Sequence, residues 1–285
     1  MANLHKIFIG FNEKLELTPT KLSYLKTSEQ NIKKYIKQHF NEKHPELTFN
    51  LVRQGSYSLG TMIRTCNDYC DVDFGLRFFP FPKKLQPVTL QKYVAEALYY
   101  VKSNTPIHKK KCIRLNYRGN YHIDVTLYGL ENFSGSPKLA TKDGWEDSDP
   151  SKFKKWFEDS GGKNLSQMKR VVKYLKAWSD YKGKGILKGV VITVLVGQHF
   201  VPDKRDDISL KQTTIQILNH LRGNWSCEMP VSPFDDLIEK MSQTSSVELE
   251  SRLNSLIHDA EIAIAKNTNE EKAIYLWKKH LGKYF

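Results

Sequence analysis

Three acidic residues and a glycine-serine pair follow one another in an order that suits chemistry on a triphosphate. Gly55 and Ser56 come first, Asp71 and Asp73 form a D-x-D pair, and Asp124 stands 51 residues beyond Asp73. Glycine lets a backbone approach a phosphate closely, and a serine hydroxyl can donate a hydrogen bond to it. Magnesium prefers carboxylate oxygens and often completes its shell with substrate phosphates. The set therefore predicts a site for a nucleoside triphosphate and Mg²⁺.

Paired metal ions define the chemistry that such carboxylates support. Two ions about 3.5–4 Å apart can activate an attacking hydroxyl and stabilise a leaving pyrophosphate. Three carboxylates held close together repel one another unless a cation lies between them. We therefore expect Asp71, Asp73 and Asp124 to be catalytic and to bind two Mg²⁺ ions, which Mn²⁺ can replace.

Each part of this pattern also has a plainer interpretation. Asp71 and Asp73 could line a solvated strand edge, and Asp124 could be a polar residue near a turn. Asp124, however, interrupts the apolar and aromatic run from Tyr121 to Tyr128. An acid in a largely buried strand needs a partner, so this position favours the catalytic interpretation.

Strands are needed to bring the three carboxylates together. Residues i and i+2 of a strand share one face, so Asp71 and Asp73 should point to the same side. A neighbouring strand could then place Asp124 beside them. Gly119 and Asn120 predict a tight hairpin turn just before the Asp124 strand. The sequence predicts strands over residues 48–53, 71–79, 111–117 and 121–129.

Helices are predicted at both ends of this strand region. A long helix is expected at about 18–41, because Thr18 can serve as its N-cap and Pro19 fits its first turn. After about residue 150, nearly every segment has helical periodicity. These helices are expected over residues 150–159, 164–181, 189–201, 207–222, 233–241, 245–266 and 269–281.

The expected fold is α+β and bilobal. Residues 1–150 should form a catalytic lobe with a mixed sheet and helices, and residues 151–285 a helical lobe. The active site is expected in the cleft between the two lobes.

Composition limits the classes of protein that need to be considered. Of 285 residues, 40% are hydrophobic and 26% charged, which excludes wholesale disorder. The net charge of +13 is spread over both halves of the chain, and it suggests an anionic partner or a solvated basic surface.

The basic run at residues 108–111, one histidine followed by three lysines, is interpreted as a nucleic-acid patch or an exposed loop. No apolar run could span a membrane and no disulfide framework is apparent, so we expect a cytoplasmic location.

Several segments resemble a known superfamily. The stretches GSYSLGT, DVDFG and HIDVTLY resemble the polymerase-beta-type nucleotidyltransferases. MKRVVKYLKAWSDY, at 168–181, resembles the K-x-W helix of the oligoadenylate synthetase and cGAS branch, and GVVITVLVGQHF resembles the helix that follows it. EKAIYLWKKHLGKYF resembles the closing helix of bacterial cGAS/DncV-like nucleotidyltransferases (CD-NTases). The 14 residues between Ser56 and Asp71 form a longer loop than this resemblance predicts.

The resemblance implies an enzyme that condenses nucleoside triphosphates and releases pyrophosphate. Its product would be a cyclic di- or trinucleotide second messenger in CBASS antiphage defence, made from ATP and/or GTP, UTP or CTP. Asp71 and Asp73 would bind both metals, and Asp124 would bind the catalytic metal and help to deprotonate the attacking ribose hydroxyl. Gly55 and Ser56 would hold the donor triphosphate.

Further nucleotide-binding residues follow from the same resemblance. Lys176 would contact phosphate, and Lys173 lies three residues earlier and partly shares its face. Tyr57 is a candidate stacking surface for a base. The plainer interpretations are a solvated helix face for the two lysines and a core aromatic for Tyr57.

The resemblance also bears on partners. Accessory CBASS proteins could act on the C-terminal segment, and a monomer is expected. A nucleic-acid activator is left open, although no zinc-binding His/Cys cluster follows Lys138 to favour double-stranded DNA.

Three other functions compete with a cyclic-oligonucleotide synthase. The first is a linear nucleotidyltransferase that tails RNA or makes 2′–5′-oligoadenylate-like products. The second is an RNA-sensing pseudoenzyme, against which the intact Asp71, Asp73 and Asp124 argue. The third is a toxin that transfers nucleotides to tRNA or protein.

Overall fold

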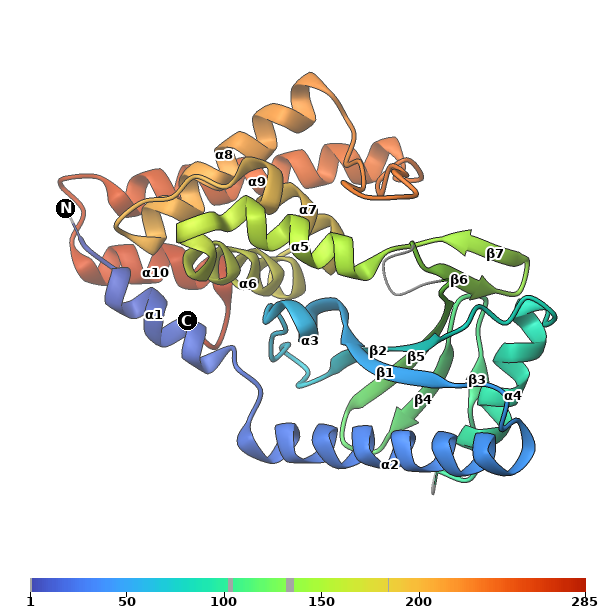
Figure 1. The fold of residues 1–285 in the computed structure, drawn as a ribbon. Helices are drawn as coiled ribbons and strands as arrows, with labels where there is room; N and C mark the ends of the chain where they lie inside the picture. Colours follow the sequence, from blue (N-terminus) through green and yellow to red (C-terminus); the bar gives the residue numbers. More distant parts are fainter. Residues whose placement is uncertain (1, 102–104, 132–135, 184) are drawn as a thin grey trace.

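A mixed β-sheet and a group of helices make up the two halves of the computed structural model (Figure 1). The model describes residues 2–101, 105–131, 136–183 and 185–285. The sheet packs on two helices at one side, and most of the remaining helices lie at the other. This arrangement is α+β, as the sequence predicts.

The sheet has seven strands among the described residues, five of them in the order β1-β2-β5-β4-β3. β2 and β5 pair in parallel, whereas the other pairs are antiparallel. β6 and β7 extend the sheet from the end of β5. The strands are β1 (Phe49–Gln54), β2 (Cys70–Phe78), β3 (Ile107–His108), β4 (Ile113–Tyr117), β5 (Tyr121–Gly129), β6 (Lys138–Thr141) and β7 (Gly144–Asp147).

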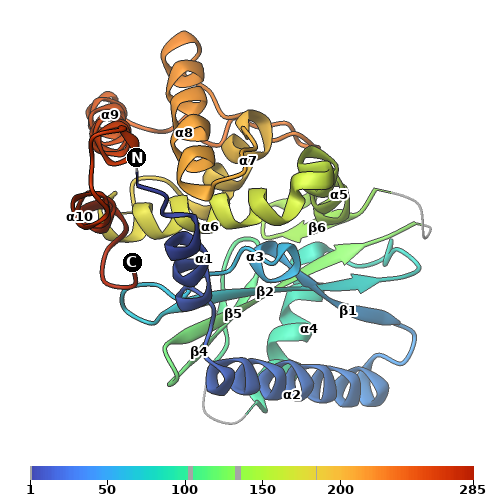
Figure 2. The same cartoon turned by 90° about the vertical axis from the view of Figure 1, so that its left-hand side faces the viewer.

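Two helices, α2 (Pro19–Lys43) and α4 (Pro87–Tyr99), cover one face of the sheet (Figure 2). The Thr18 side chain accepts a hydrogen bond from the Lys21 backbone N–H, which confirms the predicted N-cap. Alternate residues of the two central strands are buried against these helices. They are Val72, Phe74, Leu76 and Phe78 of β2, and Ile123, Val125 and Leu127 of β5.

The helical half forms a second hydrophobic core. Its helices are α5 (Pro150–Gly161), α6 (Leu165–Tyr181), α7 (Gly189–His199), α8 (Asp206–Gly223), α9 (Gln243–Ile264) and α10 (Glu270–Leu281), with a 3-10 turn, η1, at Gly162–Asn164. Side chains of Asp149, Ser242 and Asn269 cap α5, α9 and α10. The predicted helices therefore form, with one exception.

The exception is residues 233–241, where the predicted helix is wrong. This segment forms turns and a single antiparallel bridge between Glu228 and Asp236. The Asp236 carboxylate accepts hydrogen bonds from the backbone N–H groups of Cys227 and Ile238. Such side-chain acceptors compete with helical hydrogen bonds, and they hold this segment in turns.

A helix that the sequence analysis did not predict, α1 (His5–Lys14), packs against α6 and α8 (Figure 2). Its Phe8 and Phe11 contact Tyr174 of α6 edge-on and stacked, respectively. The first helix thus belongs to the helical core, while α2 belongs to the sheet core. The division of the chain near residue 150 stays a prediction. Along the described residues, no helix has both the length and the apolar character needed to cross a bilayer.

Candidate active site

Asp71, Asp73 and Asp124 lie on the sheet face that points away from α2 and α4. Their neighbours Val72 and Ile123 are buried in the opposite core, so alternation turns the three carboxylates the other way. In the parallel β2–β5 pair, Asp73 stands directly beside Asp124. The strands therefore bring together the three acids that the sequence analysis singled out.

The charge of Asp73 is strongly affected by this environment. Burial raises the pKa of its carboxyl to about 6, and the negative charges of Asp124 and Asp71 add to the effect. The positive charges of Arg114 and Lys176 act in the opposite direction. Because the pKa is raised overall, the positive charges of Arg114 and Lys176 do not fully offset burial and the two neighbouring carboxylates.

Arg114 is the closest partner of Asp124, and the sequence analysis did not identify it. Its Nε lies 2.7 Å from Oδ1 of Asp124, and its Nη2 lies 2.6 Å from Oδ2. The two residues are directly opposite each other in the antiparallel β4–β5 pair. The predicted two-residue turn at Gly119–Asn120 would have placed Leu115 opposite Asp124. The turn instead has three residues, 118–120, because β4 ends at Tyr117 and β5 begins at Tyr121, and this one-residue difference brings Arg114 to that position.

His122 is a second residue that the sequence analysis missed. Its ring is almost fully buried beside β2, with Nδ1 2.6 Å from the Tyr69 hydroxyl and 3.1 Å from Oδ1 of Asp71. Its Nε2 lies 3.8 Å from Oδ2 of Asp124. Burial is the main cause of the lowered pKa of this imidazole.

The three acids do not form an assembled metal cluster. Within the part of the chain that the structure describes, no three His, Cys, Asp or Glu side chains gather closely enough to hold a metal ion. The donor set nevertheless fits a divalent cation, because it offers hard oxygen ligands, and because burial, followed by the charges of Asp124 and Asp71, raises the Asp73 pKa in the absence of a cation. Asp71 has a 65% exposed side chain and is open to a ligand, whereas Asp124 is occupied by Arg114.

Gly55 and Ser56 begin α3 (Gly55–Leu59), a short helix that directly follows β1. Gly55 has a φ of +56°, which favours glycine. A Cβ atom at this position would lie only 2.2 Å from Oδ2 of Asp73. The glycine therefore lets the Asp73 carboxylate pack against the backbone of the predicted phosphate-binding loop.

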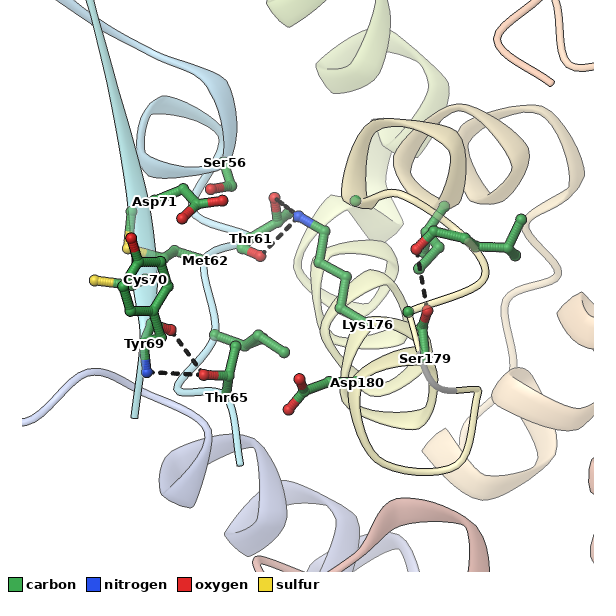
Figure 3. A pocket seen from close by; sticks show the side chains of 15 residues that line it. Ser56, Thr61, Met62, Thr65, Tyr69, Cys70, Asp71, Lys176, Ser179 and Asp180 are labelled. Carbon is green, nitrogen blue, oxygen red and sulfur yellow. Dashed lines mark hydrogen bonds between the residues drawn. The ribbon is translucent and has the colours of Figure 1, made fainter. Parts of the chain in front are cut away.

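A pocket of about 370 Å³ extends from this loop to α6 and α7 (Figure 3). Lys176 of α6 reaches across it and donates hydrogen bonds to the carbonyl oxygen and the hydroxyl of Thr61. Burial lowers the pKa of the Lys176 ammonium to about 8, although the charge of Asp73 opposes this shift. Of the predicted nucleotide-binding residues, Ser56 and Lys176 line the pocket.

Lys173 and Tyr57 are not among the residues that line this pocket. The Lys173 ammonium is buried and forms an ion pair with Glu16. Tyr57 packs against the sheet core, with the Arg53 guanidinium 4.7 Å from the centre of its ring. Their predicted roles in nucleotide binding gain no support from these positions.

The same strands carry the match to a known family. Residues 49–128 match the model for the nucleotidyltransferase domain of cyclic GMP-AMP synthase DncV-like proteins. This stretch of the chain is therefore similar to the DncV-like nucleotidyltransferase domain. The resemblance predicted from the sequence is confirmed, and the family domain contains Gly55, Ser56 and all three acids.

Two curated relatives extend the similarity beyond residues 49–128. A cyclic GMP-AMP synthase of Escherichia albertii is 28% identical over 197 residues, which cover 63% of this chain and 43% of the relative. A c-di-GMP synthase of Roseivirga ehrenbergii is 24% identical over 262 residues, covering 78% of this chain and 66% of the relative. The aligned part of this chain thus spans 43% of the first relative's length and 66% of the second's.

Solved structures of Vibrio cholerae DncV share the fold. The complex with GTP and 5MTHFGLU2 has a TM-score of 0.83 at 18% identity, and covers 99% of this chain and 96% of that chain. The complex with the linear intermediate 5′ pppA(3′,5′)pG has a TM-score of 0.80 at 17% identity, with 99% and 97% covered. The bilobal DncV fold therefore extends over nearly the whole chain.

Proposed function

We propose that this chain is a metal-dependent cyclic-oligonucleotide synthase. It would condense nucleoside triphosphates, drawn from ATP, GTP, UTP and CTP, into a cyclic di- or trinucleotide and release pyrophosphate. The observation that carries the proposal is the register of Asp73 beside Asp124 on parallel strands, with Asp71 on the same face and Gly55 packed against Asp73. The names of the two curated relatives support the same activity.

The residues of the site suit separate tasks in this reaction. Asp71, Asp73 and Asp124 would hold Mg²⁺ or Mn²⁺, which supplies charge to activate a hydroxyl and to stabilise pyrophosphate. Ser56 and Lys176 offer a hydroxyl and an ammonium to the triphosphate. His122 fixes the side of Asp71 that faces β5, and Arg114 fixes Asp124. These contacts orient the carboxylates before substrate enters.

Product analysis tests the proposal. The purified chain is incubated with Mg²⁺ or Mn²⁺ and paired radiolabelled triphosphates, and the products are treated with phosphatase and identified by chromatography and mass spectrometry. We expect pyrophosphate and phosphatase-resistant cyclic products from the wild type and none from the double variant Asp71→Ala/Asp73→Ala. Phosphatase-sensitive products that grow on an added RNA primer would instead identify a linear nucleotidyltransferase.

The biological setting is part of the same proposal. We infer a cytoplasmic, monomeric enzyme in CBASS defence, with accessory proteins acting on its C-terminal segment. In the structure, Lys283 donates a hydrogen bond to the carbonyl oxygen of Cys66, and Phe285 packs edge-on against Phe8 and Phe11. An accessory protein that modifies this segment would first have to release these contacts.

A further inference from the structure

The pocket has a carboxylate at the end that lies away from the phosphate-binding loop. Asp180, in the last turn of α6, lines the pocket with Thr65, whereas Ser56 and Asp71 line its opposite end (Figure 3). The Oδ2 atom of Asp180 accepts a hydrogen bond of 2.6 Å from the backbone N–H of Cys66. This bond fixes the carboxylate against the loop that precedes β2.

Charge divides the pocket into two parts. Ser56 and the Lys176 ammonium offer hydrogen-bond donors at one end, where Asp71 would act through the cation that the proposed function assigns to it. Asp180, which is not one of the proposed metal ligands, offers only acceptors at the other end. A triphosphate would be repelled by the Asp180 carboxylate and attracted by Lys176. A bound nucleotide would therefore place its phosphates near Ser56 and its base near Asp180.

The walls of the pocket suit a flat ring. Several apolar and aromatic side chains line it, and the Tyr69 ring is 40% exposed. Base–aromatic stacking tolerates every base, because each one has a π face. The apolar walls would therefore bind any base, and base selectivity would depend on the polar groups of the pocket. The apolar and aromatic lining residues are Met62, Ile63, Tyr69, Leu187 and Ile192.

We propose that Asp180 makes this pocket selective for guanine. The inference rests on the proposed function and goes beyond it by assigning the base and the residue that reads it. Guanine has two adjacent donors, N1–H and the N2 amino group, which match the two oxygens of one carboxylate. Adenine and cytosine place a ring-nitrogen acceptor beside their amino group, and uracil has a single N–H between two carbonyl oxygens.

Asp180 has the capacity for this second task. A carboxylate offers about four lone-pair sites, and the N–H and the thiol of Cys66 use two of them, which leaves two for a base. Among the described residues, no other backbone or side-chain N–H group donates to Asp180 within hydrogen-bond distance. Burial, followed by the hydrogen bond to Asp180, raises the pKa of the Cys66 thiol to about 11, so this neighbour is protonated and adds no negative charge.

Equilibrium binding tests the proposal on the wild-type chain. Non-hydrolysable α,β-methylene analogues of GTP, ITP, ATP, UTP and CTP are titrated in the presence of Mg²⁺ by isothermal calorimetry. We expect the GTP analogue to bind at least tenfold tighter than the ATP, UTP and CTP analogues. The ITP analogue, which lacks only the N2 amino group, should lose about tenfold relative to GTP, because it forfeits a hydrogen bond to a charged acceptor.

The variant Asp180→Asn then tests the residue itself. An asparagine side chain still has an oxygen to accept from Cys66, but its amide N–H₂ opposes the guanine donors and complements the N1 acceptor of adenine. We expect the GTP analogue to weaken about tenfold and the preference over ATP to disappear. Asp235→Asn, at an exposed aspartate outside the pocket, is the matched control and should keep the wild-type preference.

The possible results separate this proposal from the one on which it depends. Equal affinity for all analogues, or an unchanged preference in a folded Asp180→Asn variant, would overturn guanine selection and leave nucleotide binding intact. If no analogue binds, nucleotide binding and the proposed function fail together. Should Asp180→Asn not fold, the comparison of GTP with ITP on the wild type still tests guanine selection, and equal affinities for these two analogues would overturn the proposal.

Discussion

Arg114 and Asp124 form a two-point ion pair across β4 and β5, with nitrogen–oxygen distances of 2.7 and 2.6 Å. Paired donors of a guanidinium fit a carboxylate closely, and such charged hydrogen bonds are about twice as strong as neutral ones. Asp124 is therefore neutralised by a side chain while Asp73, beside it, has a raised pKa. A cation that uses Asp124 must compete with Arg114.

Replacing Arg114 by glutamine should tighten cation binding. The substitution removes both the competitor for Asp124 and a positive charge close to the site, so we expect Mn²⁺ to bind about tenfold tighter in the absence of nucleotide. Electron paramagnetic resonance of free Mn²⁺ during a titration measures this directly. Equal or weaker Mn²⁺ binding by Arg114→Gln would show that the guanidinium does not compete.

A double variant makes the test specific. In the background of Asp124→Asn, the change Arg114→Gln should have little effect on Mn²⁺ affinity, because the carboxylate for which Arg114 and Mn²⁺ compete has been removed. Arg118→Gln alters an exposed arginine in the same hairpin and serves as the control for net charge.

Asp73→Asn should stabilise the metal-free protein at neutral pH. The folded-state pKa of about 6 lies above the unfolded value of about 3.9, so the folded state holds this proton more tightly. The stability contributed by the group falls as pH rises from about 4 to 6 and stays low above that. We expect a gain of about 1–3 kcal/mol at pH 7.5 and a much smaller one at pH 4.5.

Urea unfolding in EDTA at these two pH values measures the gain. The same series for Asp235→Asn, at an exposed position, controls for the loss of one negative charge. If the Asp73→Asn variant were no more stable than the wild type at pH 7.5, the ionised Asp73 carboxylate would not destabilise the folded protein.

The acidic face of the sheet could be predicted because its signals are local. Alternation along β2 fixes the shared face of Asp71 and Asp73, and Asp124 stands out in an apolar strand. The partners of these groups depend on contacts that are distant in sequence and leave no local pattern. Lys173, for example, pairs with Glu16, 157 residues away.

The elements that the sequence analysis missed have a similar explanation. α1 is stabilised by packing against α6 and α8, which its own periodicity does not reveal. The long loop between Ser56 and Asp71 has no regular pattern, yet the Thr61 carbonyl and the Cys66 N–H attach it to Lys176 and Asp180. The role of Asp180 could therefore not be recognised before the structure placed it in the pocket.

Binding of a triphosphate should weaken as pH rises through the pKa of Lys176. This ammonium has a pKa of about 8, so it is charged at pH 7 and largely neutral at pH 9.5. We expect the affinity for inorganic tripolyphosphate to fall by up to about tenfold per pH unit above 8. Calorimetric titrations at pH 7, 8 and 9.5 measure the decline.

The variant Lys176→Arg identifies the group responsible for that decline. Arginine keeps its charge throughout this range, so its affinity for tripolyphosphate should be nearly constant with pH. Lys169→Arg, on the same helix but not among the pocket-lining residues, should retain the wild-type decline. An identical decline in Lys176→Arg would assign the pH dependence to another group.

Gly55→Ala should disturb the site through Asp73. Alanine at a φ of +56° costs about 1–2 kcal/mol, and its Cβ would overlap Oδ2 of Asp73, so this carboxylate has to move. We expect lower stability in urea unfolding together with weaker Mn²⁺ binding. Gly10→Ala, within α1 and with open space around its Cβ, should instead gain about 0.5–1 kcal/mol and leave Mn²⁺ binding unchanged. If Gly55→Ala lost stability but bound Mn²⁺ normally, the contact between Gly55 and Asp73 would matter for folding alone.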